Sequence, residues 1–206
     1  MDYNNKYIQT FNEGMLAASS FVDRKLITND LFLENLNDLT KEIKHSSGRI
    51  FFFGNGASSS FANHMALDWS KNGGILSLSL SDSALLTALS NDYSYFEAFV
   101  EFMKINHVNS NDLVVTISSS GNSKNIVNVL KYCSENSLNS LSLSGLNEDN
   151  KSLELSKYAI YYPFRTYGMV ECAHQLFLHV WLDRYMDIKD WNKIESQNMD
   201  ANNFKI

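Results

Sequence analysis

Imidazole and carboxylate side chains occur in this chain at helical spacing, where they could bind a metal ion or move protons. His64 and Asp68 are four residues apart, which places both on one face of a helix. Glu171 and His179 are eight residues apart, about two helical turns, and His174 lies on the flank of that face. Such groups can ligate a divalent cation such as Zn²⁺. A carboxylate base and a histidine acid also suit enolisation next to a carbonyl.

Each of these residues also has a purely structural interpretation. A lone helical histidine is often a packed residue with one hydrogen bond, and an acid near a helix N-terminus is favoured by the helix dipole. We favour a function for the set, because His64 lies one helical stretch beyond a loop suited to binding phosphate.

Two loops rich in serine and glycine follow apolar segments and lead into helix-length segments. They read Gly54-Asn55-Gly56-Ala57-Ser58 and Ser118-Ser119-Ser120-Gly121-Asn122-Ser123. Hydroxyl groups and backbone N–H groups at a helix N-terminus form a cradle for phosphate. Neither a nucleotide-binding lysine after the glycine nor a G-x-G-x-x-G pattern occurs, which favours the phosphomonoester of a small molecule. The alternative is that Ser120 or Ser123 merely caps the following helix.

The elements that position these loops follow from the pattern of apolar residues. Strands are predicted at 49–53, 75–80, 112–117, 139–143 and 158–162, and helices at 58–71, 82–105, 123–136, 148–156 and 167–186. Apolar strands that alternate with helices predict an α/β fold, with a parallel sheet covered by helices on both faces. Ligands of such sheets bind at the carboxyl ends of the strands, where both loops lie.

The N-terminal part differs in pattern. Residues 1–45 contain no strand-like run and predict a pair of helices broken near 26–30. Such a pair cannot bury both faces alone, so we expect it to pack on the main sheet or on a partner subunit. The predicted organisation is an N-terminal helical extension at 1–45 that makes oligomer contacts, a main domain at 46–188, and a polar C-terminal tail at 189–206.

Composition limits the class of protein. The 206 residues carry a formal net charge of −6, which argues against a nucleic-acid partner. No apolar run approaches the roughly 20 residues of a membrane-spanning helix, and the first ten residues lack the features of a secretory signal. Cys133 and Cys172 form no C-x-x-C pattern. We therefore expect a cytoplasmic protein with no membrane partner.

The two serine-rich loops resemble those of the sugar isomerase (SIS) domain, a flavodoxin-like fold that binds phosphosugars. The resemblance covers roughly residues 45–186. It implies that the second loop holds the phosphate of a sugar.

The helical residues extend this resemblance. The segments 64–68 and 171–179 resemble motifs of the D-sedoheptulose 7-phosphate isomerases (phosphoheptose isomerases), which begin bacterial heptose synthesis. The resemblance implies one Zn²⁺ per site, with an acid–base pair formed by Asp68 and His179. The implied metal ligands are His64, Asp68, Glu171 and His179. The implied substrate contacts are Asn55, Ser58, Asp92, Ser118, Ser119, Ser120, Ser123 and Glu171.

The chain departs from the motifs of that family at several positions. Asp68 stands in place of a glutamate and Glu171 in place of a glutamine. Before the last helix, Gly168 and Met169 replace an aspartate and an arginine. These changes bear on the identity of the sugar more than on the type of reaction.

The resemblance implies a homo-oligomeric phosphosugar aldose–ketose isomerase, a tetramer, that converts D-sedoheptulose 7-phosphate to D-glycero-D-manno-heptose 7-phosphate for lipopolysaccharide or capsule. One alternative is a non-catalytic SIS-domain protein of the type that regulates replication initiation. Those relatives lack the C-terminal histidine, whereas this chain has His179. A second alternative is an isomerase of a different sugar phosphate.

Overall fold

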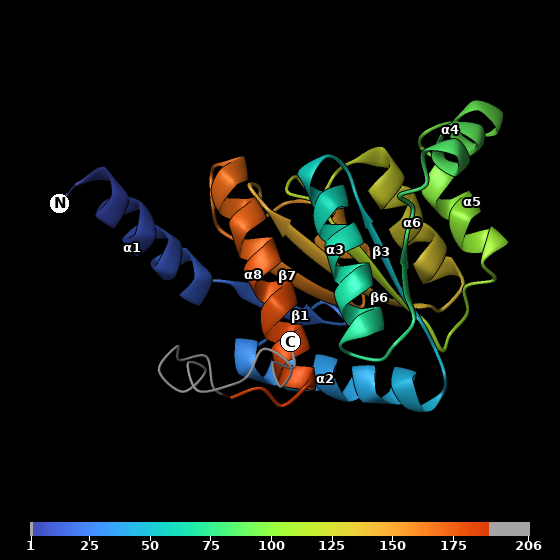
Figure 1. Cartoon of the computed structure of the whole chain (residues 1–206). Helices are drawn as coiled ribbons and strands as arrows, with labels where there is room; N and C mark the ends of the chain where they lie inside the picture. The colour runs from blue at the N-terminus through green and yellow to red at the C-terminus, as the bar shows by residue number, and fades with distance from the viewer. Residues whose placement is uncertain (1, 190–206) are drawn as a thin grey trace, which may run out of the picture.

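The computed structural model describes residues 2–189 and contains a seven-stranded sheet in the order β2-β1-β7-β6-β5-β3-β4 (Figure 1). The predicted strands are present as β3 (Ile50–Gly54), β4 (Ser77–Ser79), β5 (Leu113–Ile117), β6 (Asn139–Gly145) and β7 (Tyr158–Tyr162). All four pairings among these strands are parallel, which confirms the predicted five-stranded parallel sheet.

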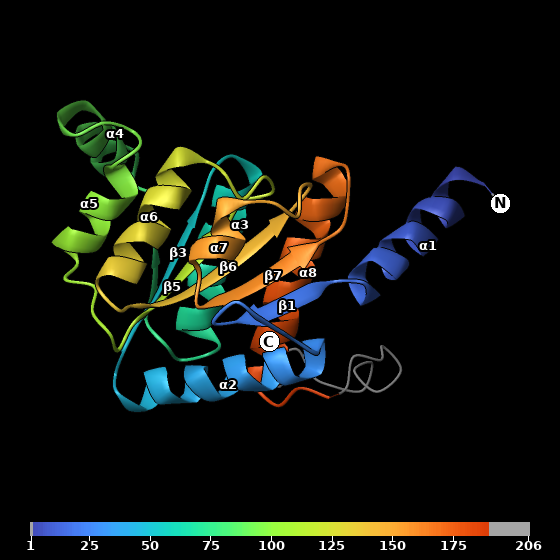
Figure 2. The ribbon, with the colours of Figure 1, turned by 180° about the vertical axis from the view of Figure 1, so that it is seen from behind.

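Helices cover both faces of this sheet, as Figures 1 and 2 show from opposite sides. One face packs against α2 (Asn29–His45), α3 (Ala57–Lys71) and α8 (Tyr167–Tyr185). The other packs against α5 (Ala98–Ile105) and α6 (Lys124–Glu135), beside α4 (Ser83–Asp92) and α7 (Lys151–Leu155). The predicted helix at 82–105 is thus two helices. No helix among residues 2–189 is long and apolar enough to cross a membrane.

Strand β3 shows why the sheet needs apolar residues on both faces. Its side chains alternate between the two cores, with Ile50 and Phe52 in one and Phe51 and Phe53 in the other. Because successive side chains of a strand point to opposite faces, a strand covered on both sides favours apolar residues at every position.

The N-terminal region corrects the expectation of two helices with no strand between them. The helices are α1 (Tyr3–Leu16) and α2, but β1 (Ser19–Val22) and β2 (Lys25–Ile27) form a hairpin between them. The two turn residues, Asp23 and Arg24, both have positive φ, which is characteristic of the type I′ turn of a two-residue hairpin. Strand β1 then pairs antiparallel with β7 and extends the sheet.

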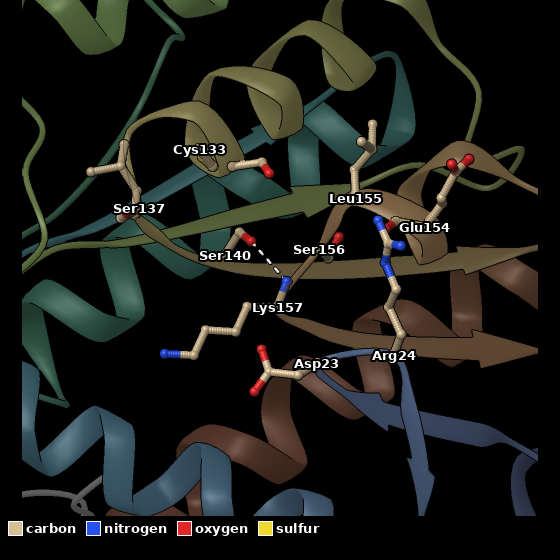
Figure 3. Close-up of a pocket in the computed structure, with 11 residues that line it drawn as sticks. Asp23, Arg24, Cys133, Ser137, Ser140, Glu154, Leu155, Ser156 and Lys157 are labelled. Carbon is tan, nitrogen blue, oxygen red and sulfur yellow. Dashed lines mark hydrogen bonds between the residues drawn. The ribbon is translucent and has the colours of Figure 1, made fainter.

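The hairpin turn lies beside the segment that leads into β7, and Figure 3 shows Asp23 and Arg24 near Glu154 and Lys157. The Asp23 backbone N–H donates to the carbonyl oxygen of Lys157, and Arg24 Nε donates to that of Glu154, both at 2.8 Å. A cavity of about 380 Å³ lies here, and burial raises the pKa of the Cys133 thiol at its edge to about 12. A thiol that stays protonated is a poor nucleophile. This cavity lies at the amino ends of β6 and β7, away from the serine-rich loops.

Helix α1 extends away from the sheet and buries none of its residues within the chain (Figure 2). Its main aromatic contact is the stacking of Phe11 on Phe164, with ring centroids 5.5 Å apart. Helix α2, in contrast, contributes Phe32 and Leu36 to the main core. The predicted oligomer contact of residues 1–45 stays a prediction, and the predicted tail lies outside the described residues beyond Lys189.

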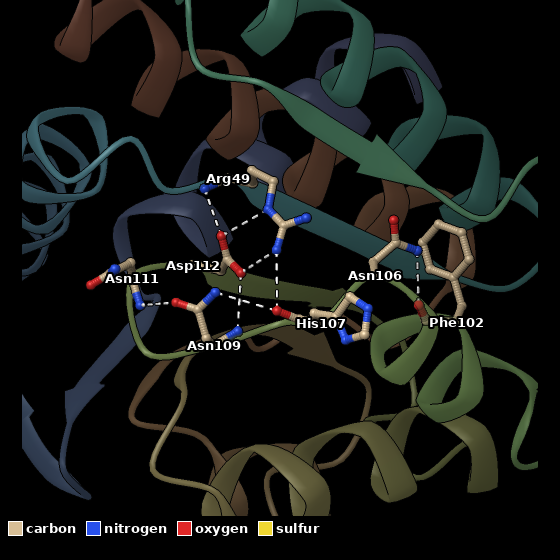
Figure 4. A network of polar contacts seen from close by, with 7 residues as sticks. All are labelled: Arg49, Phe102, Asn106, His107, Asn109, Asn111 and Asp112. Carbon is tan, nitrogen blue, oxygen red and sulfur yellow. Dashed lines mark hydrogen bonds and ion pairs between the residues drawn. The ribbon is translucent and has the colours of Figure 1, made fainter.

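A buried carboxylate joins the amino ends of β3 and β5 (Figure 4). Asp112 is 1% exposed and accepts hydrogen bonds from the Arg49 backbone N–H at 2.8 Å, from Arg49 Nη2 at 2.8 Å and from the Asn109 backbone N–H at 3.0 Å. These bonds hold the two neighbouring strands β3 and β5 in one register. The loops at the other ends of the same strands are thereby aligned.

We expect Asp112→Asn to destabilise the protein by about 2–3 kcal/mol, because it removes the charge and leaves buried donors of Arg49 poorly satisfied. Guanidinium unfolding followed by circular dichroism measures this loss. The matched control is Asp38→Asn, which breaks an exposed pair with Lys41 and should cost about 0.5 kcal/mol or less. Equal, small effects in the two variants would contradict the role assigned to Asp112.

Candidate active site

The two serine-rich loops form the wall of one cavity of about 330 Å³ at the carboxyl ends of β3 and β5. Of the predicted substrate contacts, those that line it are Asn55, Ser58, Ser118, Ser119, Ser120, Ser123 and Glu171. Tyr167 completes the wall from the first turn of α8. Asp92 lies outside this cavity, exposed at the end of α4, so its role in substrate binding stays a prediction.

Two of the helix N-termini at this cavity, those of α3 and α6, lack the side-chain cap that most of the described helices have. In α1, α2, α4, α7 and α8 the N-cap side chain accepts a hydrogen bond from a first-turn N–H. Gly56 and Ser123, the N-caps of α3 and α6, make no such bond. The capping alternative is therefore wrong for Ser123, and Ser120 Oγ accepts instead from the N–H of Asn122, which precedes the helix, at 3.2 Å. Helix starts without side-chain caps are suited to an anion.

Gly121 allows the second loop to turn and to pack closely. Its φ is +63°, and a Cβ there would lie 2.1 Å from Asn150 Oδ1. The Gly121 carbonyl also accepts from the backbone N–H and the hydroxyl of Ser152. A side chain at this position would displace the loop that carries the serines.

A histidine–aspartate cluster lies where α3 packs against α8. One ligand atom from each of His64, Asp68 and His179 lies within 4.8 Å of the other two. His64 Nε2 is 3.2 Å from Asp68 Oδ2, and the two histidine ring centroids are 5.3 Å apart. Helices far apart in the sequence thus bring together three of the four predicted ligands.

Glu171 does not join this cluster. It lies two turns nearer the start of α8, where it lines the serine cavity. The structure therefore separates the four predicted ligands into a group of three and a carboxylate beside the phosphate loops.

The cluster fits a divalent cation by the chemistry of its donors. Two imidazoles and a carboxylate are a donor set that Zn²⁺ accepts, with a further position open. Gln175, which the sequence analysis missed, has Nε2 2.8 Å from His179 Nε2, and its Oε1 is buried without a partner. Glu171, Gln175 and His179 recur at intervals of four, and this spacing was the available signal in the sequence.

His174 lies on a different side of α8 from this stripe. It is fully buried, with its ring centroid 5.9 Å from that of Tyr162. Burial lowers the pKa of His174 to about 4, against a smaller opposing effect of the Ser144 backbone. It is a neutral core residue, as the structural interpretation of the helical histidines allowed.

Sequence analysis also missed two residues beside the first loop. Tyr95, between α4 and α5, and Asn125, in the first turn of α6, both hydrogen-bond the side chain of Asn55. A tyrosine and an asparagine at these positions carry no spacing signal, because their contacts with Asn55 join residues 40 and 70 positions apart.

Comparison with known proteins agrees with the family resemblance seen in the sequence. The model of the SIS domain family matches residues 17–145. The phosphoheptose isomerase of Helicobacter pylori strain P12 is 32% identical over 73% of this chain and 84% of its own length. Phosphoheptose isomerase 2 of Campylobacter jejuni is 29% identical over 87% of this chain and 91% of its own length. The structure of the Neisseria gonorrhoeae phosphoheptose isomerase shares the fold with a TM-score of 0.73, at 21% identity, over 88% of this chain and 96% of the other.

Burial of neutral His174 predicts a pH dependence of stability. Its pKa of about 4 lies below the 6.5 of an unfolded histidine, so the unfolded chain takes up the proton first as the pH falls. The stabilisation is complete above pH 6.5 and is lost progressively as the pH falls toward 4. We expect His174→Leu to show a smaller fall in Tm between pH 7 and pH 4.5 than the parent protein. His45→Gln, at an exposed histidine, should leave the dependence of Tm on pH unchanged. If Tm of His174→Leu fell with pH as much as Tm of the parent protein, the assignment of His174 as a neutral core residue would be refuted.

Proposed function

We infer the function of this chain from its family, because it belongs to the SIS-domain family and, within it, to the phosphoheptose isomerases. We propose that it interconverts D-sedoheptulose 7-phosphate and D-glycero-D-manno-heptose 7-phosphate, an aldose–ketose isomerisation in bacterial heptose synthesis. The observation that carries this proposal is that α3 and α8 each reach both the serine cavity and the histidine–aspartate cluster.

The spacing along these helices suits a long sugar phosphate. Six residues separate Ser58 from His64 on α3, and eight separate Glu171 from His179 on α8. At 1.5 Å per residue these correspond to about 9 and 12 Å along the helix axes. A phosphate bound by the serines can therefore lie well apart from a reacting carbonyl near the cluster. Binding energy at the phosphate then orients the reacting end.

In the proposed reaction the protein moves protons between two adjacent carbons and their oxygens. The Asp68 carboxylate takes the proton from C1 of the ketose, and an enediolate forms. The same carboxylic acid returns the proton to C2. His179 protonates the C2 oxygen and accepts the proton of the C1 hydroxyl, so that the aldehyde forms at C1. Both groups belong to one cluster, as such a transfer requires.

We propose Zn²⁺ as the cofactor, held by His64, Asp68 and His179. When bound, such an ion supplies polarisation of the substrate carbonyl. Gln175 Oε1 is an additional oxygen next to the same side chains. Glu171, in the serine cavity, is better placed to contact the substrate than to complete the ligand set.

We also propose a cytoplasmic homotetramer whose product serves lipopolysaccharide or capsule synthesis. The oligomer is supported by exposed apolar side chains on α1 and on the outer faces of α3 and α8. They are Tyr3, Ile8, Leu16, Leu67, Leu176 and Val180. Light scattering after size-exclusion chromatography gives the number of subunits.

In a non-catalytic SIS-domain protein, the histidine–aspartate cluster would have no catalytic role. Its relatives lack the histidine at the position of His179, whereas here that residue lies against His64. Incubation of the purified protein with sedoheptulose 7-phosphate and rival ketose phosphates, followed by NMR identification of products, decides between the isomerases and a binding protein.

We expect Asp68→Asn and His179→Gln to lower turnover by at least about a hundredfold, because each removes a group that transfers protons. Turnover is followed by NMR, and folding by circular dichroism and Tm. His45→Gln serves as the control for a histidine far from the site. Near-normal turnover in both Asp68→Asn and His179→Gln would refute the assignment of the acid–base pair.

Metal binding is testable without turnover. After EDTA treatment, Zn²⁺ at about 100 times its Kd should stabilise the protein by about 2.7 kcal/mol, which corresponds to a Tm increase of about 5–10 °C. His64→Ala and His179→Ala should abolish the increase. Glu171→Gln should retain the Tm increase, because Glu171 lies outside the cluster. Loss of the increase in this variant would instead identify Glu171 as a metal ligand.

A further inference from the structure

We propose that Gln175 weakens the binding of a cation at His179, because its amide group donates a hydrogen bond to the ring nitrogen that carries the free lone pair. The inference rests on the proposed Zn²⁺ site and extends it to a residue outside the predicted ligand set. Gln175 acts only through His179 and is therefore a positioning residue.

The Gln175 side chain lies at the interface between α8 and α3, which run side by side (Figure 1). Gln175 and His179 are four residues apart on α8 and share one face of the helix. Gln175 Nε2 is 2.8 Å from His179 Nε2 and 3.7 Å from the sulfur of Met65. Met65 is fully buried on α3, next to His64. The amide group therefore connects the ring of His179 to the buried part of the interface.

The sulfur of Met65 indicates which amide atom of Gln175 faces His179. A thioether sulfur has no hydrogen and can only accept a hydrogen bond, although it is a weak acceptor. A nitrogen with two hydrogens suits a place between this sulfur and an imidazole nitrogen, whereas an amide oxygen there would face the lone pairs of the sulfur. One N–H of Gln175 is thus available to Met65 and the other to His179.

This contact fixes the tautomer of His179. An amide nitrogen can only donate, so His179 Nε2 must accept with its lone pair. The two nitrogens of a neutral imidazole carry one hydrogen and one lone pair between them, so the hydrogen of His179 lies on Nδ1. The N–H of Gln175 therefore occupies the one ring lone pair with which neutral His179 could bind a cation.

A cation can bind His179 only if this hydrogen bond is lost. A cation at Nε2 displaces the N–H of Gln175 directly. A cation at Nδ1 moves the ring hydrogen to Nε2, where it meets the amide N–H as a second donor. The amide would then have to turn its oxygen toward His179 and toward the sulfur of Met65. In either case the free energy of cation binding is less favourable than it would be without the amide.

A weakened contact with the cation suits the second role proposed for His179, which is to transfer protons. A ring nitrogen whose lone pair is bound to a metal ion cannot accept a proton, so the two roles compete for the same lone pair. By competing with the cation, the N–H of Gln175 leaves His179 available for proton transfer for a larger share of the time.

Calorimetric titration of the EDTA-treated protein with Zn²⁺ measures the competition. Gln175→Leu removes the amide, and we expect the affinity for Zn²⁺ to rise about three- to tenfold, the equivalent of one hydrogen bond. Gln9→Leu, at an exposed glutamine of α1, is the matched control and should bind Zn²⁺ as the parent protein does. An equal or lower affinity in Gln175→Leu would show that the amide does not compete with the cation, and absence of Zn²⁺ binding in both proteins would overturn the inference together with the proposed cofactor.

NMR correlation of the ring protons with the ring nitrogens tests the tautomer in the metal-free protein. At about pH 8, where an ordinary imidazole is neutral, His179 of the parent protein should have an unprotonated Nε2 and a protonated Nδ1. Gln175→Glu should protonate Nε2, because a carboxylate can only accept. A protonated Nε2 in the parent protein contradicts the inference. Neither measurement uses a sugar, so absence of turnover with sedoheptulose 7-phosphate would refute the proposed reaction without affecting this result.

Discussion

The parallel pairing of β3 with β5 is the constraint on which the site depends. Their register runs from Ile50 opposite Leu113 to Gly54 opposite Ile117, so the strands end at the same level and their two loops begin side by side. The Asp112 carboxylate holds the other ends of the same strands. Since a parallel register has no hairpin to set it, this buried ionic contact and the two-sided apolar packing must do so.

The second constraint is the packing of α3 on α8, which brings the histidines together. Trp69 and Trp181 are both fully buried, and their ring centroids are 4.4 Å apart. Trp69 follows Asp68 directly, and Trp181 lies two residues after His179. The Trp181 indole N–H donates to the Thr40 hydroxyl, which fixes the rotation of α8. The histidine–aspartate cluster and the contact between the two tryptophans therefore depend on the same interface between α3 and α8.

The parts of the fold and of the site that depend on local sequence pattern could be predicted from the sequence. Strands apolar on both faces were recognisable, as was the shared face of His64 and Asp68. The hairpin at 19–27 was not, because its turn has neither glycine nor asparagine and its partner β7 is more than 130 residues away. Helical spacing alone also could not tell which residues of α8 reach α3, so Glu171 was predicted both as a metal ligand and as a substrate contact, whereas the structure places it only at the serine cavity.

As the proposed phosphate site, the serine cavity would have to bind an anion without the help of a lysine or an arginine in its lining. None of the residues that line it is a lysine or an arginine, and one, Glu171, is an acidic residue. Attraction therefore has to come from N–H and O–H dipoles at two helix starts, in a site where Ser58, Ser118 and Ser119 are largely removed from water. A carboxylate in the same cavity repels a phosphate dianion and attracts sugar hydroxyls. In the proposed mode of binding, the carboxylate of Glu171 would orient a phosphosugar with its phosphate toward the serine loops and its hydroxylated chain toward α8.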